Sequence, residues 1–321
     1  VSSSHYSFKP PIYKPLLFIM SYSDMDKNID KILGKKAFST NEKSFTMSTK
    51  TNNGVALKAT TSIKGSTTTK LNCKFNHSSG VNFSKIDVVS DGKVAIEANC
   101  KSGIDGCDIT SEFTMGTAKW LAASKKNTEK AKIGFDYSAG DLTSSFGFDF
   151  LAKSGDSDVV CFTPELCYTM DNLQFGADAT VNFPSPFGGE GGATALTDYS
   201  VGFGYKTGDF DFVANVAQPG KDNTLSASFF NKANSTTKWG ATFAQGAGAD
   251  FASRPFDIKV GASFQNSSDM STMLAINQNA VGSFKVTQAL NGGSTLTLQT
   301  EIDFNNLEKD AKFGLGFDMK F

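Results

Sequence analysis

The chain of 321 residues has little arginine, little histidine and no long apolar run. Arg254 is the only arginine and the net charge is −1 at pH 7, so the chain lacks the basic surface that nucleic-acid binding requires. The longest unbroken apolar run, 16–20, is far below the roughly 18 residues that a membrane-spanning helix needs. These absences exclude a nucleic-acid-binding protein and a helical membrane protein.

Groups for catalysis and metal binding are also scarce. The two histidines, His5 and His77, lie far apart and have no Ser or Cys motif beside them, so we do not expect an enzyme. The five cysteines are odd in number and show no CxxC spacing, which argues against a disulfide framework and against a zinc site. We expect free thiols, no metal site and no cofactor.

The chain is rich in alternating segments. In the stretch 313–321, large apolar side chains take every odd position, and Gly, Asp or Lys takes every even one. Successive side chains of a strand point to opposite faces, so such a strand has one apolar and one polar face. Nineteen alternating segments follow one another from 44–50 to 311–321. Most have about the ten residues that a tilted strand needs to cross a bilayer.

This pattern predicts an all-β fold, a 19-stranded transmembrane β-barrel that occupies 44–321. A soluble β-sandwich would show the same alternation, but it needs long crossover connections that the chain does not have. A closed barrel also leaves no backbone edge unpaired in hydrocarbon. The alternation therefore favours a barrel in lipid.

Two segments precede the predicted barrel. Residues 1–21 form an N-terminal extension with three prolines, which predict an extended arm, and they lack the basic or Arg-rich pattern of a targeting peptide. Residues 22–40 are predicted to contain a short amphipathic helix, with Ser23 as its N-cap and Gly34 at its C-terminal end. The apolar positions at helical spacing are Met25, Ile29, Ile32 and Leu33.

Strand parity assigns most charged side chains to the polar face, which lines the lumen of the predicted barrel. The lysines assigned to the lumen are Lys70, Lys74, Lys93, Lys132, Lys206, Lys238, Lys259, Lys285 and Lys320. The carboxylates assigned to it are Glu97, Asp136, Asp149, Asp178, Asp211, Asp257, Glu301, Asp303 and Asp318. The two signs nearly balance, and salt screens charge over about 8 Å, so we expect weak ion selectivity.

The predicted helix can add positive charge at a constriction. Its lysines are Lys27, Lys31, Lys35 and Lys36. If the helix lies against the inner wall, these lysines attract phosphate-bearing solutes as point charges. The alternative is an ordinary solvated helix face.

Several motifs resemble the mitochondrial voltage-dependent anion channel, or eukaryotic porin, family. The segment 201–210, VGFGYKTGDF, is similar to a family stretch, and the residues Tyr22, Asp24 and Lys27 are similar to the start of its pore helix. The resemblance covers nearly the whole chain from Tyr22. It implies a pore-bound helix and a 19-stranded barrel, the strand number of this family. The last strand resembles a mitochondrial sorting signal at Lys312, Gly314, Phe317 and Met319.

Two features depart from the family. Lys85 stands where the family has a membrane-facing Glu, and its parity matches that of Phe83 and Val89 on the predicted lipid face. One interpretation is a register slip or a snorkelling lysine, and the other is a contact with a lipid headgroup or a protein partner. The family's Gly-Leu-Lys motif is absent, so we expect no nucleotide contact through it.

The resemblance implies a diffusion channel of the mitochondrial outer membrane, surrounded by lipids, that passes anionic metabolites such as ATP, ADP and phosphate. Two alternatives keep the barrel: a protein-conducting channel of the outer-membrane translocase, and a structural subunit of a larger membrane assembly. The candidate contact segments for a homo-oligomer or a larger complex are the N-terminal extension, 1–21, and the loop 184–192. A bacterial porin is disfavoured, because it has an even number of strands and lacks the helix.

Overall fold

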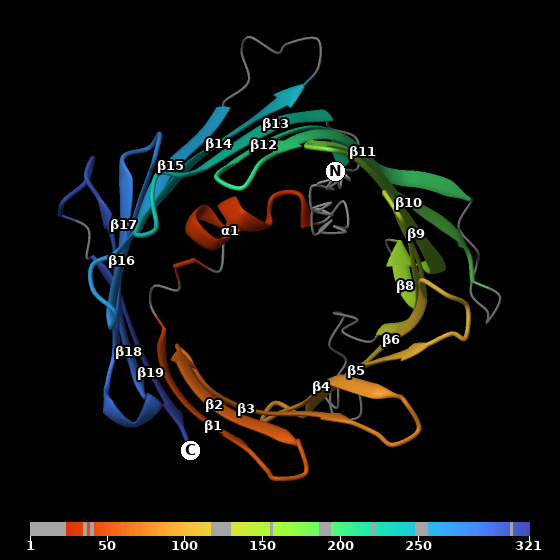
Figure 1. Cartoon of the computed structure of the whole chain (residues 1–321), viewed down its shortest axis with the longest axis horizontal. Coiled ribbons are helices and arrows are strands. Elements are labelled where there is room, and N and C mark those ends of the chain that lie inside the picture. Colours follow the sequence, from red (N-terminus) through yellow and green to blue (C-terminus); the bar gives the residue numbers. More distant parts are fainter. Residues whose placement is uncertain are drawn as a thin grey trace, which may run out of the picture.

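The computed structural model describes residues 24–34, 37–38, 42–116, 130–154, 157–185, 194–219, 223–247, 256–308 and 311–321. Within these residues, nineteen strands form a single sheet that closes into a ring (Figure 1). The strands are β1 Lys43–Lys50, β2 Ala56–Lys64, β3 Ser66–Asn76, β4 Asn82–Val89, β5 Lys93–Lys101, β6 Cys107–Gly116, β7 Lys130–Ala139, β8 Leu142–Ser154, β9 Ser157–Met170, β10 Leu173–Pro184, β11 Ala195–Lys206, β12 Phe210–Pro219, β13 Asn223–Lys232, β14 Thr237–Ala247, β15 Phe256–Gln265, β16 Met270–Asn277, β17 Val281–Ala289, β18 Thr295–Asp303 and β19 Lys312–Lys320. The predicted all-β barrel of nineteen strands is confirmed.

The barrel closes at a seam between its first and last strands. Every strand pairs antiparallel with its neighbour in sequence, whereas β1 and β19 pair parallel. An odd number of strands joined end to end must produce one parallel pair, because strand directions alternate around the ring. On the outer side of the seam, the rings of Phe45 and Phe317 stack with their centroids 6.0 Å apart. Closure leaves the sheet without a free edge.

A short helix, α1 (Lys27–Leu33), lies inside the ring (Figure 1). It packs on the inner side of β13–β16. The wall residues that touch α1 therefore face the lumen, and cross-strand pairing extends this assignment from strand to strand around the barrel. A 3-10 turn, Asn291–Gly293, lies between β17 and β18. Among the described residues, no helix has the length and apolar character to cross a membrane.

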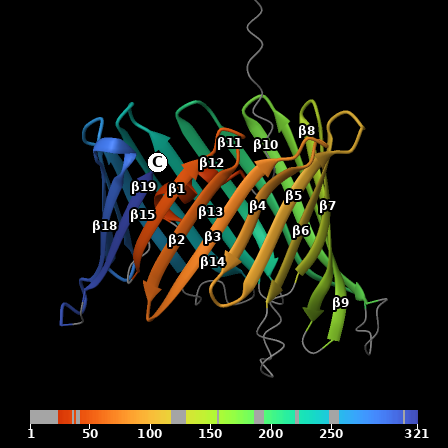
Figure 2. The same ribbon diagram turned by 90° about the horizontal axis from the view of Figure 1, so that it is seen from below.

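The outer face is apolar along the whole wall. Alternate residues such as Phe135, Phe175 and Val201 are large, apolar and exposed. Aromatic rings on neighbouring strands stack there, with the ring of Phe162 at 4.7 Å from Phe148 and 6.3 Å from Phe146, centroid to centroid. The strands run obliquely along the barrel wall (Figure 2), and their lengths range from 8 residues in β1 to 14 in β9. This is the surface that a transmembrane barrel presents to lipid.

The helix is shorter than the predicted segment 22–40 and begins later than expected. The residue before its first turn is Asp26, whose side chain makes no capping hydrogen bond, and the predicted cap Ser23 lies outside the described residues. Asp26 does not cap because its carboxylate is hydrogen-bonded to the barrel wall instead. The helix ends at Gly34, as predicted. A Cβ atom at Gly34 would lie 2.5 Å from the carbonyl oxygen of Asp30, so only glycine fits this close turn.

Lys85 faces the lumen, which corrects the parity predicted for it. Phe83 pairs with Ala98 but Lys85 pairs with Glu97, so one extra residue of β4 forms a β-bulge between them. A bulge reverses the parity of all later residues in its strand. The ammonium group of Lys85 forms an ion pair with Glu97 on the inner face. Of the two interpretations, the structure supports the register slip.

Candidate functional site

The lumen is the candidate functional site, and α1 is the largest internal element among the described residues. The helix buries Met25, Ile29, Ile32 and Leu33, the four positions predicted for its apolar face. The last three form a cluster with Phe230 of β13 and Ala275 of β16. Because these wall residues face inward, the lumen contains a small hydrophobic core against one side of the barrel.

Glycines in the wall make room for this apolar face. A Cβ atom at Gly261 of β15 would lie 2.5 Å from a methyl group of Leu33, and one at Gly204 of β11 would lie 2.7 Å from the terminal methyl group of Met25. A Cβ atom at Gly240 of β14 would likewise overlap the terminal methyl group of Ile29. Side chains at these positions would push the helix away from the strands, so the docked position depends on their absence.

Polar contacts fix the helix along its length. The Asn28 side-chain amide donates a hydrogen bond to Asp211 of β12 at 2.6 Å. At the other end, the ammonium group of Lys259 donates to the carbonyl oxygen of Leu33 at 2.6 Å, and that of Lys285 donates to the carbonyl oxygen of Ala37 at 3.0 Å. Lys259 thus satisfies a carbonyl group that the end of the helix leaves without a partner, and Lys285 holds the segment that follows the helix.

The carboxylate of Asp26 is enclosed between α1 and the wall. Ser228 of β13 donates a hydrogen bond to it, and the Asn215 side-chain amide of β12 donates another at 3.5 Å. Burial raises the pKa of Asp26 above its ordinary value of 3.8, and the charge of Asp30 adds to the increase. The hydrogen bonds from Ser228 and Asn215 act in the opposite direction but do not cancel the effect of burial.

The side of α1 that faces away from the barrel wall carries the predicted lysines that the structure describes. Lys27 is exposed, with its ammonium group 3.3 Å from Asp24 one turn earlier. Lys31 is exposed as well and lies 3.5 Å from the side-chain oxygen of Asn28. The other two, Lys35 and Lys36, lie outside the described residues. The structure therefore brings two of the four lysines to the solvent side of the helix.

Cross-strand pairing places all the lysines and carboxylates assigned to the lumen on the inward face. In the strand register, for example, Lys132 stands beside Glu112 on one neighbouring strand and Asp149 on the other. Lys259 stands beside Thr242, on the part of the wall that the helix covers. Their proposed role in ion selection stays a prediction. The same pairing shows inward-facing residues that we did not assign: Lys50, Lys58, Lys85, Lys130, Lys232, Asp87, Asp108, Glu112, Glu165 and Asp198. Counting parity along the predicted strands would have found those that lie within them, except for Lys85 and Asp87, which both follow the bulge in β4.

On the wall formed by β3–β7, opposite charges pair with one another. The ammonium group of Lys70 lies 2.6 Å from Asp87, whose side chain is only 5% exposed. Lys85 contacts the same carboxylate at 4.0 Å, and Lys130 lies 3.9 Å from Glu112. The lysines of this wall are thus partly neutralised by their neighbours.

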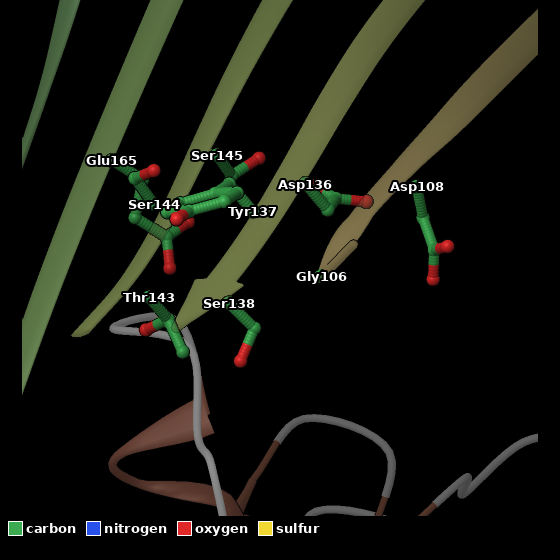
Figure 3. Close-up of a pocket in the computed structure, with 9 residues that line it drawn as sticks. All are labelled: Gly106, Asp108, Asp136, Tyr137, Ser138, Thr143, Ser144, Ser145 and Glu165. Atoms are coloured by element: carbon green, nitrogen blue, oxygen red, sulfur yellow. The ribbon is translucent and has the colours of Figure 1, made fainter. Parts of the chain in front are cut away.

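A row of carboxylates lines the wall formed by β6–β10. In the strand register, Asp108 of β6 stands beside Asp136 of β7, and Glu165 of β9 stands beside Asp178 of β10 in the same row. Figure 3 shows Asp108, Asp136 and Glu165 in a pocket together with Ser138 and other small polar residues. Within the described part of the chain, no three His, Cys, Asp or Glu side chains are arranged to hold a metal ion. Lys101 of β5 lies 2.8 Å from Asp108 and offsets one charge, and the remaining carboxylates make the wall of β6–β10 negative.

The residues of the predicted sorting signal lie on both faces of β19. Lys312 and Gly314 face the lumen, where Lys312 forms an ion pair with Glu301, and Phe317 and Met319 face outward. The five cysteines are free thiols, as predicted. The N-terminal extension and most of the loop 184–192 lie outside the described residues, so their contacts stay predictions.

Comparison with known proteins gives sequence matches over most of the chain. The sequence profile described as eukaryotic porin matches residues 20–314. A relative from Xenopus laevis, named non-selective voltage-gated ion channel VDAC2, is 24% identical over 277 residues, with 77% of this chain and 94% of the relative covered.

Solved bacterial structures give weaker similarities. OmpT of Vibrio cholerae has a TM-score of 0.43 at 11% identity, with 77% of this chain and 85% of that chain covered. OccK11 of Pseudomonas aeruginosa has a TM-score of 0.46 at 9% identity, with 81% of each chain covered. Both TM-scores are below 0.5, so the assignment of this chain rests on the sequence profile.

Proposed function

Because the chain belongs to the eukaryotic porin family, we propose that it is a voltage-dependent diffusion channel for anionic metabolites such as ATP, ADP and phosphate. The observation that carries the proposal is the closed barrel with a polar, charged inner face and an apolar outer face. The contacts of α1 with β13–β16 place the helix against one side of the ring. A solute then meets hydrated side chains of both signs along the rest of the wall.

The distribution of charge supports a weak preference for anions. Several inward carboxylates are paired with lysines, as Asp87 and Glu97 are, whereas Lys27 and Lys31 point away from the wall at the helix. A wide pore screens these charges over about 8 Å at physiological salt, so the preference is small for chloride and larger for multivalent anions. The relative from Xenopus laevis is named as non-selective, in keeping with such a weak preference.

The same relative is named as voltage-gated, and we extend this property to the chain as part of the proposal. Moving one charge across 100 mV changes the free energy by about 2.3 kcal/mol, so displacing a few charged side chains would make closure depend on voltage. The family also supports a place in the mitochondrial outer membrane, among lipids, with Lys312, Gly314, Phe317 and Met319 as the sorting signal.

Conductance in a planar bilayer tests the proposal. The purified, refolded protein is expected to give a large conductance that falls as the voltage rises, and a small reversal potential of anionic sign under a salt gradient. The variant Lys27→Glu with Lys31→Glu is expected to shift the reversal potential toward cations, because both side chains are exposed on the helix. Lys43→Glu, on the outer parity of β1, is a control outside the lumen and is expected to leave the reversal potential unchanged. A correctly inserted barrel without conductance would contradict the channel and favour the structural-subunit alternative.

A further inference from the structure

Four lysines gather on the inner face of the barrel where the chain closes. They are Lys320 of β19, Lys50 of β1, Lys58 of β2 and Lys74 of β3. We call this group the seam lysines. The pairing across the four strands places them in two adjacent rows: Lys320, Ser48 and Lys58 in one, and Lys50, Ala56 and Lys74 in the other. All four therefore lie at one mouth of the barrel.

The two rows bring the ammonium groups within reach of one small anion. Neighbouring strands are about 4.8 Å apart, and alternate residues on one face of a strand are about 6.6 Å apart. Lys58 is thus diagonal to both Lys50 and Lys74, at roughly 7–8 Å. The long, flexible lysine stems can close the remaining distances. The four side chains line a pocket of about 330 Å³, a volume in the range of small-molecule sites.

The seam lysines have no partners within the described part of the chain. None of them forms an ion pair or a side-chain hydrogen bond there, in contrast to Lys70 one row further along β3, which pairs with Asp87. Asp87 also accepts a hydrogen bond from Asn72 at 2.6 Å, so its charge is already shared. Asp318, two residues before Lys320 on the same face, offsets one positive charge. The group keeps an excess of positive charge.

The opposite charge gathers elsewhere at the same mouth. Odd-numbered strands end there, and even-numbered strands begin there, because the antiparallel strands alternate in direction. Asp108 and Asp136 pair near the start of β6 and the end of β7, in the negative wall of β6–β10. A multivalent anion entering this mouth is repelled from that wall and attracted to the seam.

We infer that the seam lysines form a binding site for polyphosphate anions, the chain of phosphates in a nucleoside triphosphate or in inorganic triphosphate. Lysine binds phosphate as a point charge, so affinity should rise with the number of phosphates and fall with added salt. The inference rests on the proposed function, because the channel supplies the route by which such an anion enters the lumen.

Isothermal titration of the refolded barrel in neutral detergent tests the site without any need for conductance. The test variant is Lys50→Gln with Lys74→Gln. The control variant is Lys232→Gln with Lys238→Gln, an inward pair at the same mouth that removes the same charge away from the seam. Inorganic triphosphate is expected to bind the test variant about tenfold more weakly than the wild type and to bind the control variant nearly as well as the wild type. Circular dichroism verifies that both variants keep the barrel.

Three further results decide the inference. Equal weakening in the two variants would overturn it, because the effect would then be one of total charge. Similar affinities for ATP and inorganic triphosphate, with weaker binding of ADP and AMP, would support recognition of the phosphate chain. Binding of ATP without binding of inorganic triphosphate would overturn it. If the barrel does not conduct but still binds triphosphate at the seam, the proposed function fails while the site stands.

Discussion

The wall behind the helix and the wall at the seam use lysine in opposite ways. On β15 and β17, Lys259 and Lys285 are half-buried and donate hydrogen bonds to carbonyl groups of the α1 segment. On β1 and β3, Lys50 and Lys74 have the same inward parity but line a pocket and have no partner among the described residues. The difference shows that the inward position of a lysine does not fix its role. The elements packed against it decide whether it is structural or free to meet a solute.

The largest expected effect is on the docking of α1 against the wall behind it. Leu33→Ala removes a buried side chain from the cluster with Phe230 and should weaken docking of α1 by about 2–5 kcal/mol. A helix of this length does not persist in water without packing, so faster hydrogen exchange of the α1 amides reports its release. Lys31→Ala, on the exposed side, is the control and should change exchange little. Unchanged exchange in Leu33→Ala would show that the cluster does not hold the helix.

A smaller effect is expected from the wall glycines. Gly261→Ala places a methyl group 2.5 Å from Leu33 and 2.6 Å from the carbonyl oxygen of Leu274, and this overpacking should cost about 1–3 kcal/mol. Gly316→Ala is the matched control, because its nearest neighbour is the Ser44 hydroxyl at 3.2 Å, far from the helix. Exchange of α1 should increase in the first variant alone. Equal behaviour of the two variants would contradict the role of the glycines in docking.

Lysine substitutions sharpen the comparison directly. Lys259→Met removes the donor to the carbonyl oxygen of Leu33 and should weaken docking by about 1–2 kcal/mol, since the charged hydrogen bond is only half-buried. Lys50→Met removes a charge without touching the helix. Hydrogen exchange of the α1 amides should therefore become faster in Lys259→Met. The reversal potential under a salt gradient should shift toward cations in Lys50→Met. The opposite assignment of effects would refute the division between the two walls.

The smallest expected effect depends on pH. Burial raises the pKa of Asp26, so the docked helix binds a proton more readily than the released one. This contribution to docking is fully present below the ordinary pKa of 3.8 and is lost as pH rises through the raised pKa. Asp26→Asn should thus slow exchange of α1 at neutral pH and keep the hydrogen bond from Ser228. Below pH 3.8 the variant and the wild type should converge. A difference that does not shrink in acid would contradict this account.

The strands and their two faces could be read from the sequence, because alternation is a local property. The segment 313–321 shows its lipid face in Phe313, Leu315 and Phe317, and the structure confirms it. Lys85 could not be placed, since one extra residue in β4 leaves no mark in the pattern but reverses every later position. A β-bulge is set by pairing with two neighbouring strands, which are distant in sequence from the bulge itself.

Contacts between the helix and the wall could not be predicted from the sequence either, because the residues that meet are distant in the chain. The sequence predicts the apolar side of α1 but not that Gly240 and Gly261, more than 200 residues later, lie beneath it. Asp26 fits a helix N-terminus by composition, yet its carboxylate is turned toward Ser228. The seam lysines were not recognised as a group, because only barrel closure brings Lys320 close to Lys50 and Lys58.

Efflux of ATP from sealed liposomes tests the central claim most directly. The refolded protein is inserted into vesicles that contain labelled ATP and a labelled polymer too large for a barrel of this size. The account predicts rapid loss of ATP, retention of the polymer, and slower loss of ATP in Lys50→Gln with Lys74→Gln than in Lys232→Gln with Lys238→Gln. Retention of ATP by vesicles with correctly inserted barrels would contradict the claim that the lumen is a path for anionic metabolites.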